Sequence, residues 1–122
     1  MRLLLDTTVL IRWHAGRLGP AGLRAVRRAE VVAVSAITAW EIAIKQAVGK
    51  LRFEDPVEAV VAQNGFLALP VTVQHGDRLR DLPRHHPDPF DRLLIVQALE
   101  EGLTILTSDR AFEPYRVPVV WA

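Results

Sequence analysis

The chain has 122 residues, of which 50% are hydrophobic and 24% are charged, and its formal net charge is +1. This composition excludes a disordered chain, and the length accommodates one domain, which we expect to span residues 1–122. There is no cysteine, which excludes disulfide scaffolds, thiolate zinc sites, iron–sulfur clusters and cysteine nucleophiles.

The expected elements alternate between short apolar runs and helical patterns. In chain order they are strand 2–5, helix 8–14, helix 20–30, strand 31–34, helix 38–48, helix 56–63, strand 66–69, helix 74–82, a proline-rich loop over 83–89, helix 90–101, strand 104–107 and strand 119–121. The strands lack an alternation of polar and apolar residues, which is typical of parallel sheets covered on both faces. We therefore expect an α/β fold of three layers, α/β/α, around a parallel sheet of about five strands.

No segment has the character of an export signal or a membrane span. Asp6 interrupts the first apolar run far short of a signal-peptide core. The uncharged stretch over 59–76 contains Pro70 and three side-chain amides, which a spanning helix would not carry. We expect a cytoplasmic protein with no membrane partner.

Four carboxylates stand where a strand passes into a helix or in the first turn of a helix. Asp6 follows strand 2–5, and Asp109 follows strand 104–107. Glu41 and Asp91 lie in the first turns of helices 38–48 and 90–101. Right-handed crossovers bring the carboxyl ends of parallel strands to one edge of the sheet, where ligands bind. These four acids are therefore expected to lie near one another.

Each acid also has a purely structural explanation. Thr38 and Glu41 fit a capping box, and Glu41 with Lys45 fits an ion pair between successive helical turns. The remaining acids fit cap or first-turn positions: Asp6 and Asp109 as N-caps, Asp88 as the cap before Pro89, and Asp91 in the first turn.

Crowding favours a metal site over four separate caps. Two carboxylates about 5 Å apart repel by roughly 3 kcal/mol in a protein-like dielectric, and Ser, Thr or Asn would cap a helix without that cost. Crowded carboxylates are typical of Mg²⁺ or Mn²⁺ sites, and such ions serve phosphoryl chemistry. The hydroxyls of Thr7 and Ser108 stand next to the acids Asp6 and Asp109, where they could hold a metal-bound water.

The segments around these acids resemble the PIN-domain ribonuclease toxins of the VapC type, from bacterial toxin–antitoxin pairs. The matching segments follow the family's order over residues 3–112: Leu-Leu-Leu-Asp6-Thr-Thr, Trp40-Glu41-Ile-Ala-Ile-Lys45, His86-Pro-Asp88-Pro-Phe-Asp91-Arg92 and Leu106-Thr-Ser-Asp109-Arg-Ala-Phe112. Carried over by position, Asp6, Glu41, Asp91 and Asp109 match the family's catalytic quartet, with Asp6, Asp91 and Asp109 as expected metal ligands. The resemblance further implies hydrolysis of RNA to 5′-phosphate and 3′-hydroxyl ends with Mg²⁺ or Mn²⁺, a homodimer, and a cognate antitoxin.

Arginine dominates the basic residues. Arg92 and Arg110 directly follow two of the acids, and we expect them to hold carboxylates in place or to contact substrate phosphate. Two further groups fit either contacts with RNA phosphates or solvated surfaces: Arg24, Arg27 and Arg28, and Arg78, Arg80 and Arg84.

Histidine and tryptophan support structural interpretations. His85 and His86 fit a surface loop, because adjacent side chains point apart in most backbones and no third nitrogen or sulfur ligand stands at zinc spacing. The tryptophans Trp13, Trp40 and Trp121 are expected in the core or at a dimer interface, and Trp40 could also orient Glu41.

Two other functions remain open from the residues alone. A phosphatase with Asp6 as nucleophile usually needs a second Asp two residues later, where this chain has Thr8. A non-catalytic module would use the acidic pocket to bind a basic peptide. Cleavage of RNA that depends on a divalent metal separates the expected enzyme from such a module.

Overall fold

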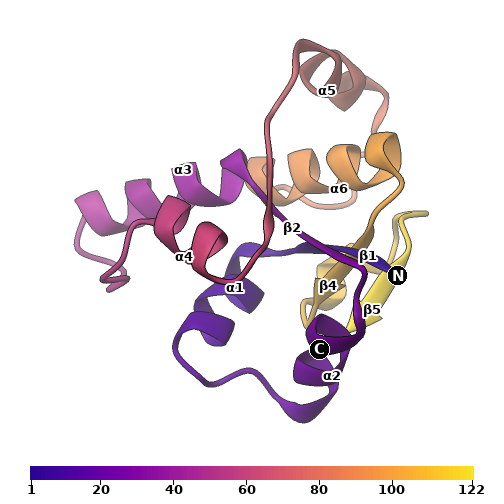
Figure 1. Ribbon diagram of the computed structural model, residues 1–122. Helices are drawn as coiled ribbons and strands as arrows, with labels where there is room; N and C mark the ends of the chain where they lie inside the picture. The colour runs from indigo at the N-terminus through magenta and orange to yellow at the C-terminus, as the bar shows by residue number, and fades with distance from the viewer.

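A five-stranded parallel sheet lies at the centre of the computed structural model, which describes residues 1–122 (Figure 1). The strand order is β3-β2-β1-β4-β5, so β1 lies in the middle. The expected parallel sheet is confirmed. The strands are β1 (Arg2–Leu5), β2 (Val31–Ser35), β3 (Leu67–Leu69), β4 (Thr104–Thr107) and β5 (Val119–Trp121).

Helices connect the strands and cover the sheet. They are α1 (Thr7–His14), α2 (Pro20–Arg28), α3 (Ala36–Ala47), α4 (Val57–Gln63), α5 (Val73–Arg78) and α6 (Pro89–Glu101), with short 3₁₀-helices η1 (Leu79–Asp81) and η2 (Arg110–Phe112). None of them combines the length and the apolar character that crossing a membrane requires.

The central strand shows why the fold has three layers. Leu4 faces the cluster that α6 closes, whereas Leu3 and Leu5 face the cluster that α1, α2 and α4 close. All three side chains are fully buried, because successive residues of a strand point to opposite faces and both faces are covered. The apolar strand without polar alternation thus corresponds to a sheet packed between two layers of helices.

Helix α3 begins two residues earlier than expected, and the capping box is wrong. Ser35 is the N-cap, and its hydroxyl accepts a hydrogen bond of 3.0 Å from the backbone N–H of Ile37. Thr38 lies inside the helix and is fully buried. The chain passes from β2 into α3 without a loop, so the residue that ends the strand also caps the helix. The ion pair between Lys45 and Glu41 is present at 2.9 Å.

The expected helix over 74–82 is two elements. α5 begins after Thr72, whose hydroxyl accepts from the N–H of His75 while the His75 ring accepts from the N–H of Thr72. The helix ends at Arg78, and η1 follows. The other 3₁₀-helix, η2, was not expected, because a single turn leaves no periodic pattern in the sequence. The remaining boundaries differ by at most two residues.

Candidate active site

Asp6 stands where β1 passes into α1, and the protein holds both of its carboxylate oxygens. Oδ1 accepts a hydrogen bond of 2.7 Å from the backbone N–H of Val9, which makes Asp6 the N-cap of α1. Oδ2 accepts a hydrogen bond from the hydroxyl of Thr107, at the end of the neighbouring strand β4. Asp6 is buried, so these contacts fix the orientation of its carboxylate.

Glu41 extends from α3 towards the start of α1. Its Oε1 accepts a hydrogen bond of 2.7 Å from the Thr7 hydroxyl, which also lies 3.3 Å from the hydroxyl of Thr38. Its Oε2 accepts a hydrogen bond of 2.9 Å from the ammonium group of Lys45. That hydrogen bond raises the pKa of Lys45, which is partly exposed. The buried carboxylate of Glu41 is thus oriented by a hydroxyl and balanced by one positive charge.

Asp91 lies in the first turn of α6. As expected, Asp88 caps this helix, and its Oδ1 accepts a hydrogen bond of 2.8 Å from the N–H of Phe90. Oδ2 of Asp91 lies 2.9 Å from Nε2 of His86 in the preceding loop. The pKa of Asp91 is raised to about 6, first by burial and then by the charge of Asp88, while the contact with His86 opposes the rise.

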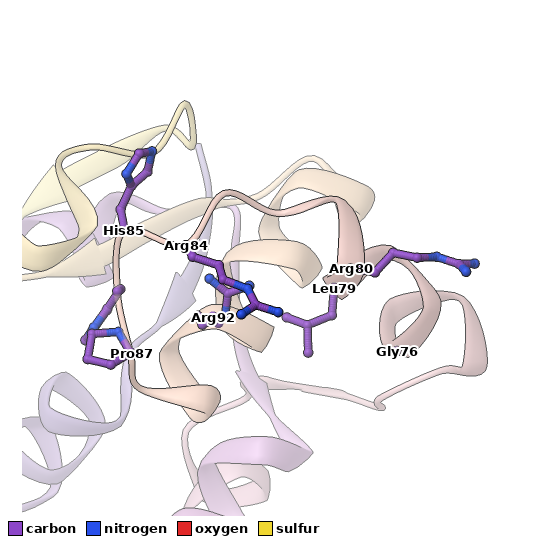
Figure 2. A pocket seen from close by; sticks show the side chains of 8 residues that line it. Gly76, Leu79, Arg80, Arg84, His85, Pro87 and Arg92 are labelled. Carbon is purple, nitrogen blue, oxygen red and sulfur yellow. The ribbon is translucent and has the colours of Figure 1, made fainter.

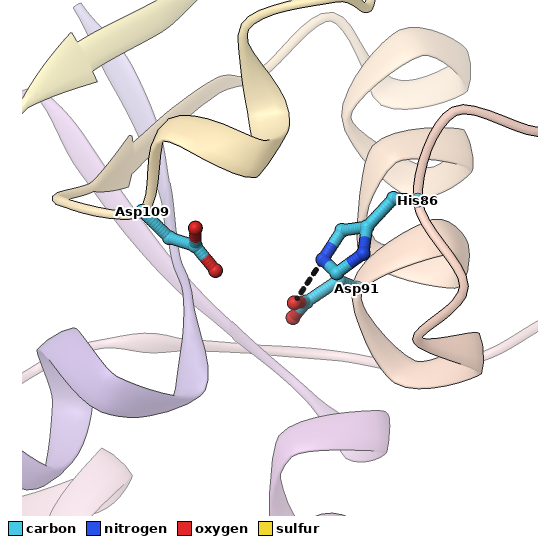
Figure 3. A group of neighbouring side chains, drawn as sticks. All are labelled: His86, Asp91 and Asp109. Carbon is cyan, nitrogen blue, oxygen red and sulfur yellow. Dashed lines mark hydrogen bonds and ion pairs between the residues drawn. The ribbon is translucent and has the colours of Figure 1, made fainter.

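Asp109 follows β4 and is exposed. Its backbone N–H donates to the Thr107 hydroxyl at 3.0 Å, and its Oδ1 accepts a hydrogen bond of 2.9 Å from the N–H of Ala111. One carboxylate oxygen of Asp109, one of Asp91 and a ring nitrogen of His86 all lie within 4.8 Å of one another. In Figure 3 the Asp109 carboxylate faces the hydrogen-bonded pair of His86 and Asp91.

Printed contacts place the four acids at one edge of the sheet. Thr107 bonds to both Asp6 and Asp109, and Asp109 lies near Asp91. Glu41 bonds to Thr7, which follows Asp6. Burial is the main cause of the raised pKa of Asp6, which the hydrogen bonds from Thr107 and Val9 oppose. The charges of Asp109 and Glu41 add to the rise. The charge of Asp6 contributes in turn to the raised pKa of Asp91. The structure therefore brings together the acids that were expected to converge.

This donor set fits a hard divalent cation. The only ammonium group that bonds to these acids is that of Lys45, so the negative charge exceeds the positive charge beside it. Divalent ions such as Mg²⁺ and Mn²⁺ prefer carboxylate oxygens, and a bound cation would relieve the repulsion that raises the carboxyl pKa values.

Comparison with known proteins assigns the family. The PIN domain family matches residues 3–117. The chain belongs to the PIN domain family. Over 126 aligned residues it is 31% identical to Ribonuclease VapC22 of Mycobacterium tuberculosis, and the match covers 97% of each chain. The PIN assignment made from the segments around the acids is thus confirmed.

Solved structures share the PIN fold of this chain. VapBC2 from Rickettsia felis, bound to a DNA fragment from its promoter, matches with a TM-score of 0.74 and 12% identity over 99% of this chain and 98% of that one. DNA-bound VapBC from Salmonella typhimurium matches with a TM-score of 0.71 and 20% identity over 99% and 98%. At these identities the likeness establishes the fold alone, and it confirms the three-layer architecture.

Neither arginine that follows an acid of the PIN site touches a site carboxylate. Arg92 donates to the backbone carbonyls of Pro83 at 2.8 Å and Leu82 at 3.3 Å, so it holds the preceding loop. Arg110 places its guanidinium carbon 4.1 Å from the centre of the Trp121 ring. The expectation that they hold site carboxylates is therefore wrong, because each guanidinium is engaged elsewhere. Contact with substrate phosphate stays a prediction.

The two hydroxyls expected near a metal differ in position. Thr7 bonds to a site acid, as described above. Ser108 is exposed and accepts a hydrogen bond of 3.2 Å from Arg12. Its buried neighbour Thr107 contacts Asp6 instead. The sequence does not show which of Thr107 and Ser108 turns towards Asp6, because the direction of both side chains depends on where β4 ends.

His86 lies in the candidate site, although the sequence predicts only a surface loop at this position. Adjacent histidines do point apart here. The ring of His85 packs 5.2 Å from that of Tyr115, whereas the side chain of His86 is only 12% exposed and turns to Asp91. The backbone N–H groups of both histidines donate to the Tyr115 hydroxyl at 3.1 and 2.8 Å. The available signal was a histidine shortly before the helix that carries Asp91.

The tryptophans do not share one environment. Trp40 is 60% exposed and makes an edge contact with Phe90, with 5.4 Å between ring centres. A core position is therefore wrong for Trp40, and a place at a dimer interface stays a prediction. Trp13 and Trp121 are partly buried.

Proposed function

We propose that this chain is a metal-dependent endoribonuclease and the toxin of a toxin–antitoxin pair. The observation that carries the proposal is the convergence of Asp6, Glu41, Asp91 and Asp109 at one edge of the sheet. Support comes from the 31% identical relative, which is named a ribonuclease, and from similar structures that are toxin–antitoxin complexes. The substrate is RNA, and the reaction is hydrolysis of a phosphodiester bond.

In this proposal Asp6, Asp91 and Asp109 hold Mg²⁺ or Mn²⁺. Such an ion supplies Lewis acidity towards the phosphodiester and a lowered pKa for the attacking water. Thr107 fixes the carboxylate of Asp6, and His86 fixes that of Asp91, so two ligands are oriented before the ion arrives. Preorganised ligands bind and act without rearrangement.

The fourth acid, Glu41, has a separate role. The hydroxyl of Thr7 and the ammonium of Lys45 each hold one of its oxygens, which leaves its remaining lone pairs to accept a proton from the attacking water. The water oxygen joins the phosphorus and the bond to the 3′-oxygen breaks. That oxygen takes up a proton from solvent, and Glu41 releases the proton it accepted to solvent. The products carry 5′-phosphate and 3′-hydroxyl ends.

Cleavage assays with the purified protein test this function. We expect RNA cleavage with Mg²⁺ or Mn²⁺, loss of cleavage in EDTA, and 5′-phosphates on the products when the ends are sequenced. Asp109→Asn should abolish cleavage, and Asp77→Asn, an exposed acid on α5, should leave it intact. Products with 2′,3′-cyclic phosphates made in EDTA would contradict the proposal, since the RNA's own 2′-hydroxyl would then be the nucleophile.

The partners follow from the same proposal. A cognate antitoxin binds this chain, which forms a homodimer in the cytoplasm. Helix α3 carries Glu41 and exposes the large apolar side chains of Trp40 and Ile44 one turn apart. Val48, the C-cap of α3, is exposed one turn further on, and a protein partner would cover all three. Light scattering of the chain alone measures its oligomeric state, and a monomer at micromolar concentration would contradict the homodimer.

A further inference from the structure

A basic pocket lies next to the candidate active site. Its volume is about 720 Å³, and five of its eight lining residues are basic, namely Arg80, Arg84, Arg92, His85 and His86. None of the eight is acidic. In Figure 2 Arg84 and Arg92 extend into the space between the loop and α6, whereas Arg80 reaches outward at the rim. Positive side chains thus meet in one hollow of a protein whose net charge is only +1.

The charges of Arg80 and Arg84 are not neutralised within the chain. Arg80 and Arg84 form neither an ion pair nor a hydrogen bond. Their neighbour Arg78 is different, because it lies 4.0 Å from a carboxylate oxygen of Asp81 and 3.4 Å from one of Glu100. Basic side chains that gather without acidic partners favour an anionic ligand.

One member of the pocket is held in place before any ligand binds. Arg92 donates to the carbonyls of Leu82 and Pro83 and lies 3.4 Å from the hydroxyl of Tyr115. A guanidinium has five N–H donors in a planar fork, so donors remain for a ligand. Arg92 therefore offers a fixed charge, and the unpaired Arg84 offers an adjustable one.

The pocket is continuous with the acids through His86. This histidine lines the pocket and bonds to Asp91 on its other side. A polynucleotide carries one negative charge per nucleotide, so a strand with one phosphate at the acids presents its next phosphates to the neighbouring surface. An arginine-lined hollow at that position matches this repeat of charge.

We propose that Arg80, Arg84 and Arg92 form a subsite for backbone phosphates of single-stranded RNA beside the bond that is cleaved. This inference rests on the proposed function. Guanidinium groups bind phosphate oxygens in a bidentate manner, and such contacts fix the position of a strand without selecting its bases. The subsite therefore holds RNA in place and contributes little sequence preference.

Binding of a labelled single-stranded RNA oligonucleotide, measured by fluorescence anisotropy in EDTA over a range of KCl concentrations, tests the subsite. The double variant Arg80→Ala/Arg84→Ala removes both unpaired arginines, and Arg92 is left intact because it holds the loop. We expect roughly tenfold weaker binding at low salt. We also expect the slope of log K against log salt to become shallower by about 1.4, since each lost phosphate contact on a single strand contributes about 0.7.

A matched control removes the same charge elsewhere. Arg24 and Arg28 lie beside Met1, which precedes β1 and so stands at the opposite end of that strand from Asp6. This position favours the solvated-surface interpretation of these two arginines over contacts with RNA. We therefore expect Arg24→Ala/Arg28→Ala to bind RNA like the parent. Equal losses in both double variants would overturn the subsite, because net charge alone would then explain the effect.

Two further outcomes decide the inference separately from the function. Unchanged affinity and unchanged salt slope in the pocket variant overturn the subsite even if the parent cleaves RNA. An acidic peptide that displaces the RNA as well as an unlabelled oligonucleotide of equal charge also overturns it, in favour of a protein ligand. Because binding is measured without metal, a parent that fails to cleave RNA contradicts the proposed function and not this measurement.

Discussion

At the scale of single residues, the contact between His86 and Asp91 is open to a direct test. The two side chains are 12% and 16% exposed, and Nε2 lies 2.9 Å from Oδ2. Loss of a hydrogen-bond partner of a metal ligand typically lowers activity or metal affinity about 10- to 100-fold, and we expect this loss of kcat/KM for His86→Ala. His86→Gln keeps an N–H donor and should recover part of the lost kcat/KM.

The control for this variant is His14→Ala. His14 is the last residue of α1, at the opposite end of that helix from Asp6, and it pairs with Asp55 at 3.0 Å. We expect this control to cleave RNA at the rate of the parent. Mn²⁺ affinity, measured by calorimetry, should fall with His86→Ala and stay unchanged with His14→Ala. Full activity and full Mn²⁺ affinity in His86→Ala would show that the histidine serves the loop alone.

The raised pKa of Asp91 predicts that the metal-free protein loses stability as the pH rises. Its pKa is about 6 in the folded chain against an ordinary value of 3.8. Between these values the folded state holds more protons than the unfolded state, so the free energy of unfolding falls with rising pH. Each pKa unit is worth about 1.36 kcal/mol, so this group removes roughly 2–3 kcal/mol by neutral pH.

Urea unfolding in EDTA between about pH 4 and pH 7 measures this loss. Asp91→Asn has no carboxyl to titrate and should show a flatter dependence on pH. If Asp91→Asn showed the same pH dependence as the parent, another group would be responsible for the loss of stability.

The convergence of the acids could be predicted from the sequence, whereas the side chains that form hydrogen bonds with them could not. Asp6 and Asp109 follow apolar strands, and every parallel strand directs its carboxyl end to the same edge. The roles of His86 and Thr107 depend instead on the path of a loop and on the exact end of β4. No local pattern in the sequence encodes either feature.

At the scale of elements, the junction between β2 and α3 is held by one hydroxyl. The Ser35 hydroxyl accepts from the N–H of Ile37 at 3.0 Å and donates to Oε1 of Gln97 at 2.5 Å. Gln97 is fully buried on α6. Ser35→Ala removes the cap and leaves a buried carbonyl without that donor, so we expect a loss of about 1–3 kcal/mol.

Urea unfolding of Ser35→Ala against the parent measures this loss. Thr8→Ala, at an exposed position in the first turn of α1, is the control and should change stability by less than about 0.5 kcal/mol. If Ser35→Ala were no more destabilised than Thr8→Ala, the cap and the contact with Gln97 would not hold this junction.

The elements themselves were predicted to different degrees. The strands and the longer helices were found because apolar runs and helical periodicity extend over several residues. The start of α3 was misplaced because Ser35 and Thr38 both offer a capping hydroxyl, and only packing chooses between them. Reciprocal hydrogen bonds between Thr72 and His75 fix the start of α5. The end of α5 at Arg78, where η1 follows, was missed because a single 3₁₀ turn leaves no periodic pattern.

At the scale of the whole molecule, the sequence predicts parallel strands but not their order. β1 pairs with β2 on one side and with β4 on the other, so Leu4 lies opposite Ile105, far away in the chain. Such long-range pairing depends on the collective packing of both layers. It also explains the site, because Asp6 and Asp109 follow neighbouring strands and both bond to Thr107.

If these acids bind a cation as proposed, we expect the stability of the whole molecule to depend on divalent metal. An ion that binds the folded state alone stabilises it by about 2.7 kcal/mol at a hundred times its Kd, which we expect to raise the Tm of the parent by roughly 10 °C. Asp109→Asn removes one charge and keeps the Oδ1 acceptor for the N–H of Ala111. In EDTA this variant should be as stable as the parent or more stable, because one source of repulsion is gone.

Thermal melts with EDTA and with Mg²⁺ or Mn²⁺ separate a ligand from a cap. Asp77→Asn, an exposed acid outside the site, should respond to metal as the parent does. Asp109→Asn should gain much less, because a cation held by fewer carboxylates binds more weakly. Equal metal responses in the parent and in Asp109→Asn, together with a loss of stability in EDTA, would make Asp109 only the cap of η2. The repulsion among the acids would then lack the cation that we expect to balance it.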